Sequence, residues 1–580
     1  MKKKSHSIFA VLALALVIAA AIVVFALIRK YTPSKEHEDL TTYYHLTNSD
    51  EVAIVLNNEV TSSKARVIDG HIYIDYDFVH DNLNSRFYWD NNENILLYAT
   101  TQNLISAQAE QTSYMVTKSS ADYGRKIVTI NSDTAYIDLD FVKEYSDFKY
   151  KHVKDPHRII ITSQWGKYQT ATAKRNASLR VRGGIKSPIL KEVSSKEEVT
   201  VIEQGDNWDK VMTDDGIIGY MQKRMLSSVK EKTRKSDFTP DTFAHIKKDY
   251  NICMAWHQVT NQSANNAVSS VLANTRGINV LSPTWFYLND NNGNIANLAS
   301  LNYVNYCHNQ GIEVWALVSN LENKNVDTTE VLTHTSKRQN LVNQIVSMAI
   351  QYNLDGINVD FESMNGEKVG DAFIEFIREL SIKCKNNGVV LSVDNYVPMS
   401  HTSFYNRKEQ ANFADYVVIM GYDEHYAGSP EAGSVASLSW VTQGVSDTLK
   451  EVPADQVILG PADQVILGMP FYTRVWEIPS ESSSDDTAAG AKIPSKIYGM
   501  KAANDFLATH GATKTWLDDC GQNYSEFTDN DTTYKVWLGD SASAECRLKL
   551  VEKKKLAGAS FWKLGFETSD IWDTVTRYIH

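Results

Sequence analysis

Eight short apolar segments alternate with helical patterns through the C-terminal part of the chain, residues 246–580. The segments begin at Ile252, Ile278, Ile312, Leu354, Val389, Asp415, Val465 and Gly558. Patterns such as KRQNLVNQIVSMAIQYN fill the intervals between them. Strands that alternate with helices favour a parallel sheet. Eight such units in a block of this length predict the α/β fold class, as a (β/α)8 (TIM) barrel.

The fourth segment, LDGINVDFESM, carries polar side chains at alternate positions. Asn358, Asp360 and Glu362 share one face of the expected strand, and apolar residues occupy the other face. Buried carboxylates are costly unless they are paired or hydrogen-bonded. One face of a barrel strand, however, lines the interior and leads to the C-terminal rim, where active sites lie. The pattern therefore predicts a cleft above this strand.

The spacing of the two carboxylates favours acid–base chemistry. Asp360 and Glu362 should lie about 6–7 Å apart along the strand. Two carboxylates at that separation resist being ionised together, which raises the pKa of one of them. Glu362 is the outermost and is partly desolvated, so we expect it to be the general acid.

A long apolar run, from Ile8 to Ile28, follows the basic sequence MKKKSHS. About 20 apolar residues are enough to span a bilayer core, and the FALIRK at its end is a poor site for signal cleavage. The charged flanks are nearly balanced, so orientation depends on the basic N-terminus staying inside. We expect residues 1–30 to be a cytoplasmic tip and a single-pass anchor in the cell membrane, with the later domains outside the cell. The alternative is secretion after signal cleavage.

Residues 40–165 contain an internal repeat. IYIDYDFV begins at Ile72, AYIDLDFV begins at Ala135, and each copy continues through a polar gap to a short apolar strand. The alternation predicts β-structure, and repeats this short must pack on each other. The repeat resembles the stalk-like domain named after the N-terminal part of copper amine oxidase. We expect its acidic residues, such as Asp75 and Asp138, on solvated strand faces rather than as metal ligands.

Residues 167–229 alternate between short apolar runs and glycine-containing turns, which is typical of small all-β domains. LRVR from Leu179, NWDKV from Asn207 and the Gly219-Tyr220 pair resemble a bacterial SH3-type barrel. Such modules usually hold cell-wall material, and a spacer without a ligand is an equal alternative. The polar residues 230–245 are expected to be a linker.

The formal net charge of −12 argues against nucleic acid as a partner. Five cysteines, with no CxxC pair, exclude a complete disulfide framework and leave one bridge open, between Cys520 and Cys546. His257 and His425 lie near strand ends without a second ligand at metal spacing. We expect no metal, no cofactor, and a monomer.

DGINVDFE, which ends at Glu362, resembles the DGxDxDxE signature of glycoside hydrolase family 18, the chitinase-like family. Three further motifs follow in the family's order. Met420-Gly421-Tyr422-Asp423 resembles its M-x-Y-D, GMPFY ending at Tyr472 resembles its GxPFY, and Trp562 occupies the position of its substrate-stacking tryptophan. The resemblance covers the C-terminal half of the chain and says nothing about the first 240 residues.

This resemblance implies retaining hydrolysis in which the sugar's own 2-acetamido group is the nucleophile. Glu362 would protonate the glycosidic oxygen and later activate water. Asp360 would orient the acetamide and stabilise the oxazolinium cation, and Tyr422 would hydrogen-bond its carbonyl oxygen. These three are the implied catalytic residues.

The same resemblance implies a set of substrate-binding residues. Asp423 would contact the sugar in the central subsite, and Trp562 would form its floor, because an aromatic ring offers a flat apolar face. Asp355 would support the network from below. Met420, Tyr472 and Asn358 belong to the motifs that line the same site and complete the expected substrate-binding set.

Asn358 departs from the common chitinase pattern, which has Asp at this position. An amide cannot share a proton with Asp360, so we expect Asp360 to be more uniformly ionised. DGIN-x-DFE is typical of the branch that includes spore-cortex-lytic N-acetylglucosaminidases, as are GMPFYTRVW and a later stretch from Trp516 to Asp540. The expected partner is therefore an N-acetylglucosamine-containing polysaccharide, with peptidoglycan favoured over chitin, and cleavage at β-1,4 linkages.

Two other functions compete with a wall hydrolase: a chitinase, and a non-catalytic, lectin-like glycan-binding protein. A wall-stalk adhesin is a weaker alternative. Lectin-like relatives usually lose the acid, whereas Glu362 is present, which favours the enzyme.

The octapeptide PADQVILG occurs twice in succession, at 453–460 and at 461–468. We expect the second copy to form the seventh strand. The first copy is either an insert on the non-catalytic side of the barrel or a duplication error. Trp256 and Trp315 are left open between the cleft and the core.

Overall fold

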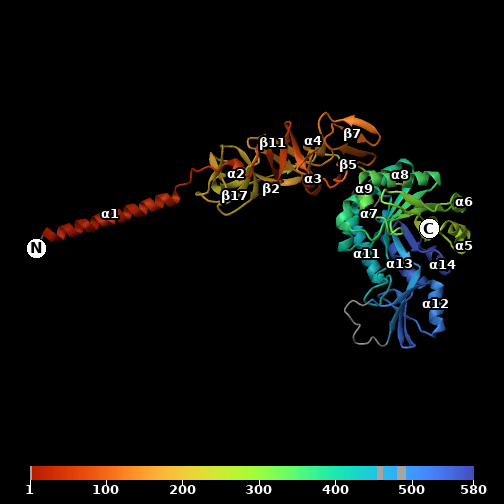
Figure 1. Ribbon diagram of the computed structural model, residues 1–580. Helices are drawn as coiled ribbons and strands as arrows, with labels where there is room; N and C mark the ends of the chain where they lie inside the picture. The colour runs from red at the N-terminus through yellow and green to blue at the C-terminus, as the bar shows by residue number, and fades with distance from the viewer. Residues whose placement is uncertain (1–2, 453–460, 480–491, 580) are drawn as a thin grey trace. The chain divides into compact units, whose positions relative to one another are not determined.

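The computed structural model describes residues 3–452, 461–479 and 492–579 (Figure 1). The chain divides into two compact units. The first comprises Met1–Phe87, Gln108–Ser113 and Asp122–Pro240, and the second comprises Tyr88–Ala107, Tyr114–Ala121 and Asp241–His580.

The second unit contains a closed parallel barrel, which confirms the predicted fold class. Its eight strands are β20 (Ile252–His257), β21 (Val280–Leu288), β23 (Glu313–Ser319), β24 (Gly356–Asp360), β25 (Val390–Tyr396), β26 (Tyr416–Met420), β27 (Val465–Pro470) and β33 (Gly558–Trp562). The strands pair in that order, and β20 closes the ring by pairing with both β33 and β21. All eight expected segments form strands. A short strand, β22 (Ile295–Asn297), pairs antiparallel with β21.

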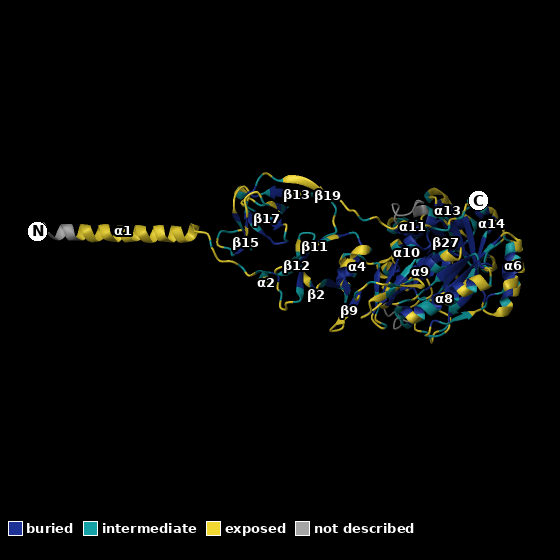
Figure 2. Ribbon diagram, turned by 90° about the horizontal axis from the view of Figure 1, so that it is seen from above, coloured by how far each residue is buried: buried dark blue, intermediate teal, exposed yellow. Residues whose placement is uncertain are grey.

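Helices surround the barrel, with their polar faces exposed and their apolar faces buried against the strands (Figure 2). They are α5 (Val268–Leu272), α6 (Leu301–Asn309), α7 (Thr328–Thr333), α8 (Thr335–Gln351), α9 (Gly366–Asn386), α10 (Arg407–Phe413), α11 (Leu438–Glu451), α13 (Ser541–Lys554) and α14 (Ile571–Val575). Phe361, the residue that follows β24, packs on α9, where its ring stacks on that of Phe376 with the centroids 5.3 Å apart. This packing leaves the alternate, polar residues of the strand inside the barrel.

A small subdomain follows the seventh barrel strand. It consists of a five-stranded antiparallel sheet, β28 (Tyr472–Pro479), β29 (Ser495–Gly499), β30 (Thr515–Leu517), β31 (Gln522–Asp529) and β32 (Thr532–Trp537), together with α12 (Met500–Thr509). Its core contains Val475, Leu507 and Val536. β28 begins two residues after β27 ends, so the subdomain is attached directly to the C-terminal rim of the barrel.

The predicted boundary between the repeat domain and the barrel differs from the observed one. A five-stranded sheet, β4 (Phe87–Asp90), β5 (Ile95–Ala99), β6 (Leu104–Gln108), β7 (Ser113–Val116) and β8 (Ser119–Asp122), lies mostly in the second unit. Tyr88 and Leu97 are buried in the same apolar core as the barrel helices. Buried Asp90 accepts hydrogen bonds from the backbone N–H and the hydroxyl of Thr335, the first residue of α8, each at 2.6 Å. A segment from the repeat therefore caps a barrel helix.

The first unit is built on two seven-stranded sheets. The first sheet has the order β11 (Lys149–Lys154), β12 (His157–Thr162), β1 (Glu51–Leu56), β2 (Glu59–Ile68), β3 (His71–Asp75), β10 (Thr134–Asp138) and β9 (Val128–Asn131). The second has the order β15 (Ile189–Val193), β14 (Ala177–Arg180), β18 (Ile218–Gln222), β17 (Trp208–Thr213), β16 (Glu198–Glu203), β13 (Gly166–Thr172) and β19 (Lys230–Arg234). β19 occupies the start of the expected linker and pairs with β13, so this stretch is a sheet edge rather than a free connection.

The two copies of the repeat each continue from a strand into a short helix. Asp75 caps α3 (Tyr76–Asn82), and Asp138 caps α4 (Leu139–Glu144) through backbone N–H groups. Asp138 is buried and forms an ion pair with Arg125 at 2.7 Å. The expectation of a solvated strand face is therefore wrong for Asp138, because a helix starts there and its N–H groups need an acceptor.

The N-terminal helix α1 (Lys3–Tyr31) is exposed throughout its described side chains (Figure 2). Its segment Ile8–Tyr31 contains an 18-residue stretch with a mean hydropathy of 3.3 and is long and apolar enough to cross a membrane. A membrane anchor and a signal peptide share these properties.

The second copy of the octapeptide forms the seventh strand, as predicted: η4 (Pro461–Gln464) leads into β27. The first copy, residues 453–460, lies outside the described residues. All five cysteines are free, so the bridge left open between Cys520 and Cys546 is not formed.

Candidate active site

Two adjacent strands present a ladder of polar side chains to the barrel interior. Asn358 of β24 is in register with Ser392 of β25. Because both strands alternate with a period of two, Asp360 comes next to Asp394, and Glu362 comes next to Tyr396 at the rim. The ladder therefore has three carboxylates, two on the β24 side and one on β25.

Asn358 is the lowest rung and is completely buried. Its carboxamide oxygen accepts hydrogen bonds from Trp256 Nε1 at 2.9 Å and from Ser282 Oγ at 3.2 Å. Its Nδ2 donates to Ser392 Oγ at 3.0 Å and to Asp394 Oδ1 at 2.8 Å. The amide thus has partners on both sides, and its orientation is fixed.

Asp360 occupies the middle rung. Its Oδ1 is buried and has no hydrogen-bond partner among the described residues. Burial raises the pKa of Asp360 well above its usual value, and the charges of Glu362, Asp394 and Glu322 raise it further. This outcome opposes the expectation that an amide at position 358 leaves Asp360 more uniformly ionised. Asp394 supplies the neighbouring carboxylate that position 358 lacks.

Glu362 lies at the top of the ladder and is held at its backbone. Asn320, which directly follows β23, accepts a hydrogen bond from the Glu362 N–H at 2.8 Å and donates one to its carbonyl oxygen at 3.0 Å. Tyr405 donates to the preceding carbonyl, of Phe361, at 2.6 Å. The backbone at Glu362 is therefore held by hydrogen bonds from two different elements.

The Glu362 side chain combines burial with one hydrogen bond. Burial raises the pKa of Glu362, whereas a hydrogen bond from the Tyr396 hydroxyl lowers it. The Tyr396 hydroxyl in turn accepts from the backbone and side chain of Ser363. A carboxyl with a raised pKa is suited to donate a proton near neutral pH.

Tyr422 and Asp423 follow β26, whose last residue, Met420, is buried. The Tyr422 ring packs edge-on against Trp256 and Tyr472, with centroids 6.5 Å and 6.3 Å away. Burial raises the pKa of Tyr422 well above its usual value, as do the nearby carboxylates Asp394 and Asp360, so its hydroxyl remains a donor. The Tyr472 hydroxyl donates to Asp423 Oδ1 at 2.5 Å, which fixes Asp423 beside Tyr422.

Trp562 ends β33 and packs against Trp256 at a centroid distance of 6.0 Å. Trp256 is buried beneath the site and holds Asn358, so it is a core residue that supports the ladder. Trp315 is also buried and donates to Glu313, the first residue of β23, at 2.9 Å. Both tryptophans therefore belong to the core.

Asp355 does not join this group. It precedes β24, and its Oδ2 accepts from the Val314 N–H at 2.8 Å and pairs with His308 of α6 at 2.7 Å. Asp355 is an odd number of residues from Asn358, and side chains alternate along a strand, so it faces the helix layer rather than the barrel interior. The expectation that Asp355 supports Asp360 from below is therefore wrong, and its contacts join α6 to the sheet.

Three residues of this site were not predicted: Asp394, Tyr396 and Asn320. The first two had a signal, because VVLSVDNYV carries Ser392, Asp394 and Tyr396 at alternate positions, as LDGINVDFESM does. Asn320 had no such sequence signal, since it lies in a loop after a strand and binds the backbone of Glu362, which is distant in the sequence.

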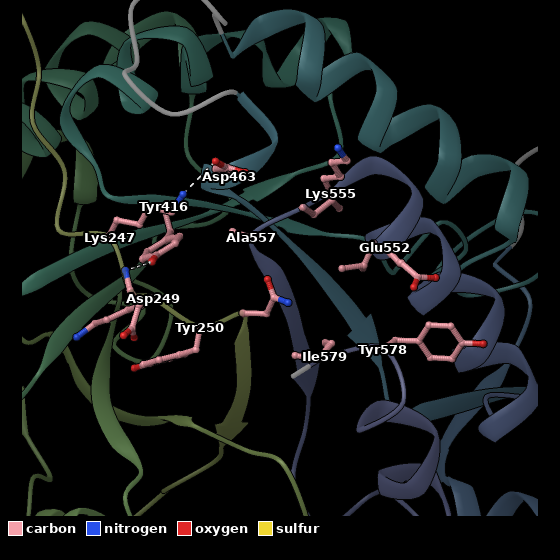
Figure 3. Close-up of a pocket in the computed structure, with 14 residues that line it drawn as sticks. Lys247, Asp249, Tyr250, Tyr416, Asp463, Glu552, Lys555, Ala557, Tyr578 and Ile579 are labelled. Atoms are coloured by element: carbon pink, nitrogen blue, oxygen red, sulfur yellow. Dashed lines mark hydrogen bonds and ion pairs between the residues drawn. The ribbon is translucent and has the colours of Figure 1, made fainter.

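A cavity of 510 Å³ lies at the opposite, amino-terminal end of the barrel (Figure 3). Its lining includes Tyr250 just before β20 and Ala557 just before β33. Two of its lysines form ion pairs: Lys247 with Asp463 at 3.0 Å, and Lys248 with Glu313 at 2.5 Å. This end of a barrel usually serves stability, and the carboxylate ladder points away from it.

Among residues 3–452, 461–479 and 492–579, no cluster of three or more His, Cys, Asp or Glu side chains could hold a metal ion.

Comparisons with known proteins identify the family to which the barrel belongs. An uncharacterized glycosylase, YvbX, of Bacillus subtilis (strain 168) is 23% identical over 338 residues, which are 54% of this chain and 92% of that protein. The cortical fragment-lytic enzyme of Bacillus anthracis is 23% identical over 270 residues, which are 44% of this chain and 57% of that enzyme. A solved C-terminal domain from Desulfitobacterium hafniense DCB-2 matches with a TM-score of 0.50 and 18% identity, and covers 57% of this chain and 100% of its own. The family model for glycosyl hydrolases family 18 matches residues 230–567. The chain therefore belongs to glycosyl hydrolases family 18 and is a glycoside hydrolase.

Proposed function

We propose that this protein cleaves β-1,4-linked N-acetylglucosamine in bacterial cell-wall glycan, with retention and with the substrate's acetamide as the nucleophile. The observation that carries this proposal is the unpartnered, buried Oδ1 of Asp360, two residues from a Glu362 whose pKa is raised by burial. A buried acceptor without a donor is costly. The N–H of a 2-acetamido group is a donor of the required kind.

Each proposed role follows from these contacts. Glu362 protonates the glycosidic oxygen, and the acetamide oxygen attacks the anomeric carbon as the bond to the leaving sugar breaks. Asp360, as the anion, accepts the acetamide N–H and stabilises the oxazolinium cation. Tyr422 donates to the acetamide oxygen, since the raised pKa keeps its hydroxyl protonated. Glu362 then removes a proton from the water that opens the oxazolinium ring, which restores the acid and retains the anomeric configuration.

The remaining residues of the site hold the sugar. Trp562 supplies an aromatic face for the ring in the central subsite, and Asp423, fixed by Tyr472, accepts from a sugar hydroxyl. Met420 is buried at the end of β26, two residues before Tyr422. Asn358 contributes through its contacts with Ser392 and Asp394 rather than through direct contact with the sugar.

The choice of wall glycan over chitin is supported by the relatives' names and by the sequence. One of the reported relatives is a cortical fragment-lytic enzyme, and the DGIN-x-DFE stretch resembles the corresponding branch. We further propose that α1 anchors the protein in the cell membrane, so that the barrel acts on glycan outside the cell. The exposed apolar surface of α1 supports this part of the proposal.

The test is digestion of purified peptidoglycan by the full chain in mild detergent, followed by mass spectrometry of the new reducing ends. New N-acetylglucosamine ends are expected. Glu362→Gln should lower the rate by about 10³-fold or more, because a general acid of this kind contributes about 10²–10⁴-fold. The matched control is Glu367→Gln, an exposed residue in the first turn of α9, which should retain activity. Cleavage of chitin alone would identify a chitinase, and binding without cleavage by the unaltered protein would identify a lectin-like protein.

A further inference from the structure

Asp394 is a buried carboxyl group that no sequence motif singled out. Only 2% of its surface is exposed, and it lies on the inner face of β25, beside Asp360. Its Oδ1 accepts the 2.8 Å hydrogen bond from Asn358 Nδ2. Within the described part of the chain, no Lys, Arg or His forms an ion pair with it. A buried carboxylate without a cation is unfavourable unless it has a role that requires it.

The groups that face Asp394 are acidic or phenolic. From β24 these are Asp360 and Glu362, and from the end of β26 it is Tyr422. The neutral Asn358 and Ser392 complete its surroundings. Two carboxyl groups so close in a medium of low polarity cannot both ionise easily, so they titrate as a pair.

The hydrogen bonds decide which member of the pair ionises first. Asp394 has a donor for its carboxylate, the Asn358 amide, whereas the buried Oδ1 of Asp360 has none. A hydrogen bond to the charged form favours ionisation. Asp394 therefore loses its proton first, and Asp360 must ionise next to an anion.

We propose that Asp394 is a positioning residue which takes the place of the aspartate absent from position 358, and that its carboxylate sets the pH at which Asp360 becomes an anion. Most members of this family, as the DGxDxDxE signature implies, carry the neighbouring carboxyl two residues before the equivalent of Asp360 on the same strand. In this chain the carboxyl is supplied by the adjacent strand, and the Asn358 amide joins the two. This inference rests on the proposed function for its kinetic consequence but not for its effect on stability.

The kinetic test is the pH profile of kcat/KM on peptidoglycan for the full chain and for Asp394→Asn. Activity requires an anionic Asp360, so the acidic limb of the profile reports its ionisation. Removing the neighbouring charge should move this limb to lower pH by about one unit or more. The matched control is Ser392→Ala, which removes the other acceptor of Asn358 Nδ2 without changing a charge, and its limb should stay in place. The exchange Asn358→Asp with Asp394→Asn should return the limb toward its original position.

A second measurement does not depend on activity. Burial and neighbouring charge raise the pKa of Asp394 in the folded protein, so its contribution to stability is greatest below its unfolded value, about 4, and falls as pH rises. The thermal midpoint of Asp394→Asn should therefore rise relative to that of the unaltered protein as the pH is raised from 4 to 7.

The outcomes separate the two proposals. If the unaltered protein cleaves no glycan, the proposed function fails, while the thermal midpoints still test the carboxyl pair. If it cleaves glycan but neither the acidic limb nor the midpoints respond to Asp394→Asn, the inference is overturned. If Asp394→Asn does not fold, Asn358→Asp serves instead: a fourth carboxyl in the ladder should move the acidic limb to higher pH, and an unmoved limb would overturn the inference.

Discussion

Asn320 and Glu362 form a closed pair of hydrogen bonds in which one side chain binds both backbone polar groups of the other residue. The Asn320 oxygen accepts from the Glu362 N–H at 2.8 Å, and its Nδ2 donates to the Glu362 carbonyl at 3.0 Å. Asn320 Nδ2 also donates to Thr328 Oγ1, at 3.1 Å. The backbone of Glu362 is therefore fixed through the end of the neighbouring strand, and these bonds do not involve its carboxyl group.

Asn320→Ala should lower kcat by about 10²-fold, because a displacement of about 1 Å in a catalytic group has this effect. KM should change much less, since the sugar-binding residues are untouched. The measurement is steady-state hydrolysis of a soluble N-acetylglucosamine oligomer. Asn323→Ala is the control, because Asn323 lies in the same loop and its side chain binds the Asn289 carbonyl at 2.7 Å and the Asn325 N–H at 3.1 Å rather than Glu362. Equal losses in both variants would show a general loop effect and contradict the role of Asn320.

Tyr396→Phe should move the basic limb of the kcat/KM profile to higher pH. The Tyr396 hydroxyl donates to the ionised form of Glu362 and thereby lowers its pKa, so removing it raises that pKa and prolongs the acid form. The expected shift is about one unit, equivalent to one hydrogen bond to a charged group. Tyr405→Phe removes a hydroxyl that binds the Phe361 carbonyl rather than the Glu362 carboxyl, and it should leave the basic limb in place. A shift to lower pH in Tyr396→Phe would contradict the assignment.

The barrel could be predicted from sequence because the patterns that specify its strands and helices are local in the chain. Each strand is a short apolar run with a helical pattern after it, and the alternation in LDGINVDFESM identifies the interior face directly. The same alternation in VVLSVDNYV would have identified Asp394 and Tyr396. Asn320 and Asp90 could not be found this way, because each acts on a partner in a different element and no local periodicity encodes that contact. Asp355 was assigned to the site because it lies next to the residues of the DGxDxDxE motif. Its position is odd, however, whereas Asn358, Asp360 and Glu362 are even, so the alternation already placed it on the face toward the helices.

The proposal that α1 is a membrane anchor predicts that the N-terminus is retained. The chain should stay in the membrane fraction after washing at alkaline pH, since a membrane-spanning helix with an 18-residue stretch of mean hydropathy 3.3 inserts effectively irreversibly. Mass spectrometry of the mature protein should recover a peptide from within residues 1–30. A soluble protein whose first residue lies beyond position 30 would instead identify a cleaved signal peptide.

Asp90→Ala should destabilise the barrel without changing its chemistry. His334, at the N-cap position of α8, makes no side-chain cap, and the Asp90 carboxylate from the β4–β5 hairpin binds the Thr335 N–H instead. Loss of such a cap costs about 1–2 kcal/mol of the free energy of unfolding, which should lower the thermal midpoint of the unit that contains the barrel. Asp90→Asn keeps an acceptor and should lose less.

The control for this experiment is Glu93→Ala. Glu93 accepts from the Ser336 N–H at 2.9 Å and is far more exposed than Asp90, which is 1% exposed. Because solvent can replace the Glu93 contacts, Glu93→Ala should have the smaller effect on the midpoint. For both variants kcat/KM should be unchanged at temperatures well below the transition, since neither residue contacts the ladder. An unaltered midpoint for Asp90→Ala would mean that α8 is capped by solvent equally well, and that this part of the repeat is not needed for the stability of the barrel.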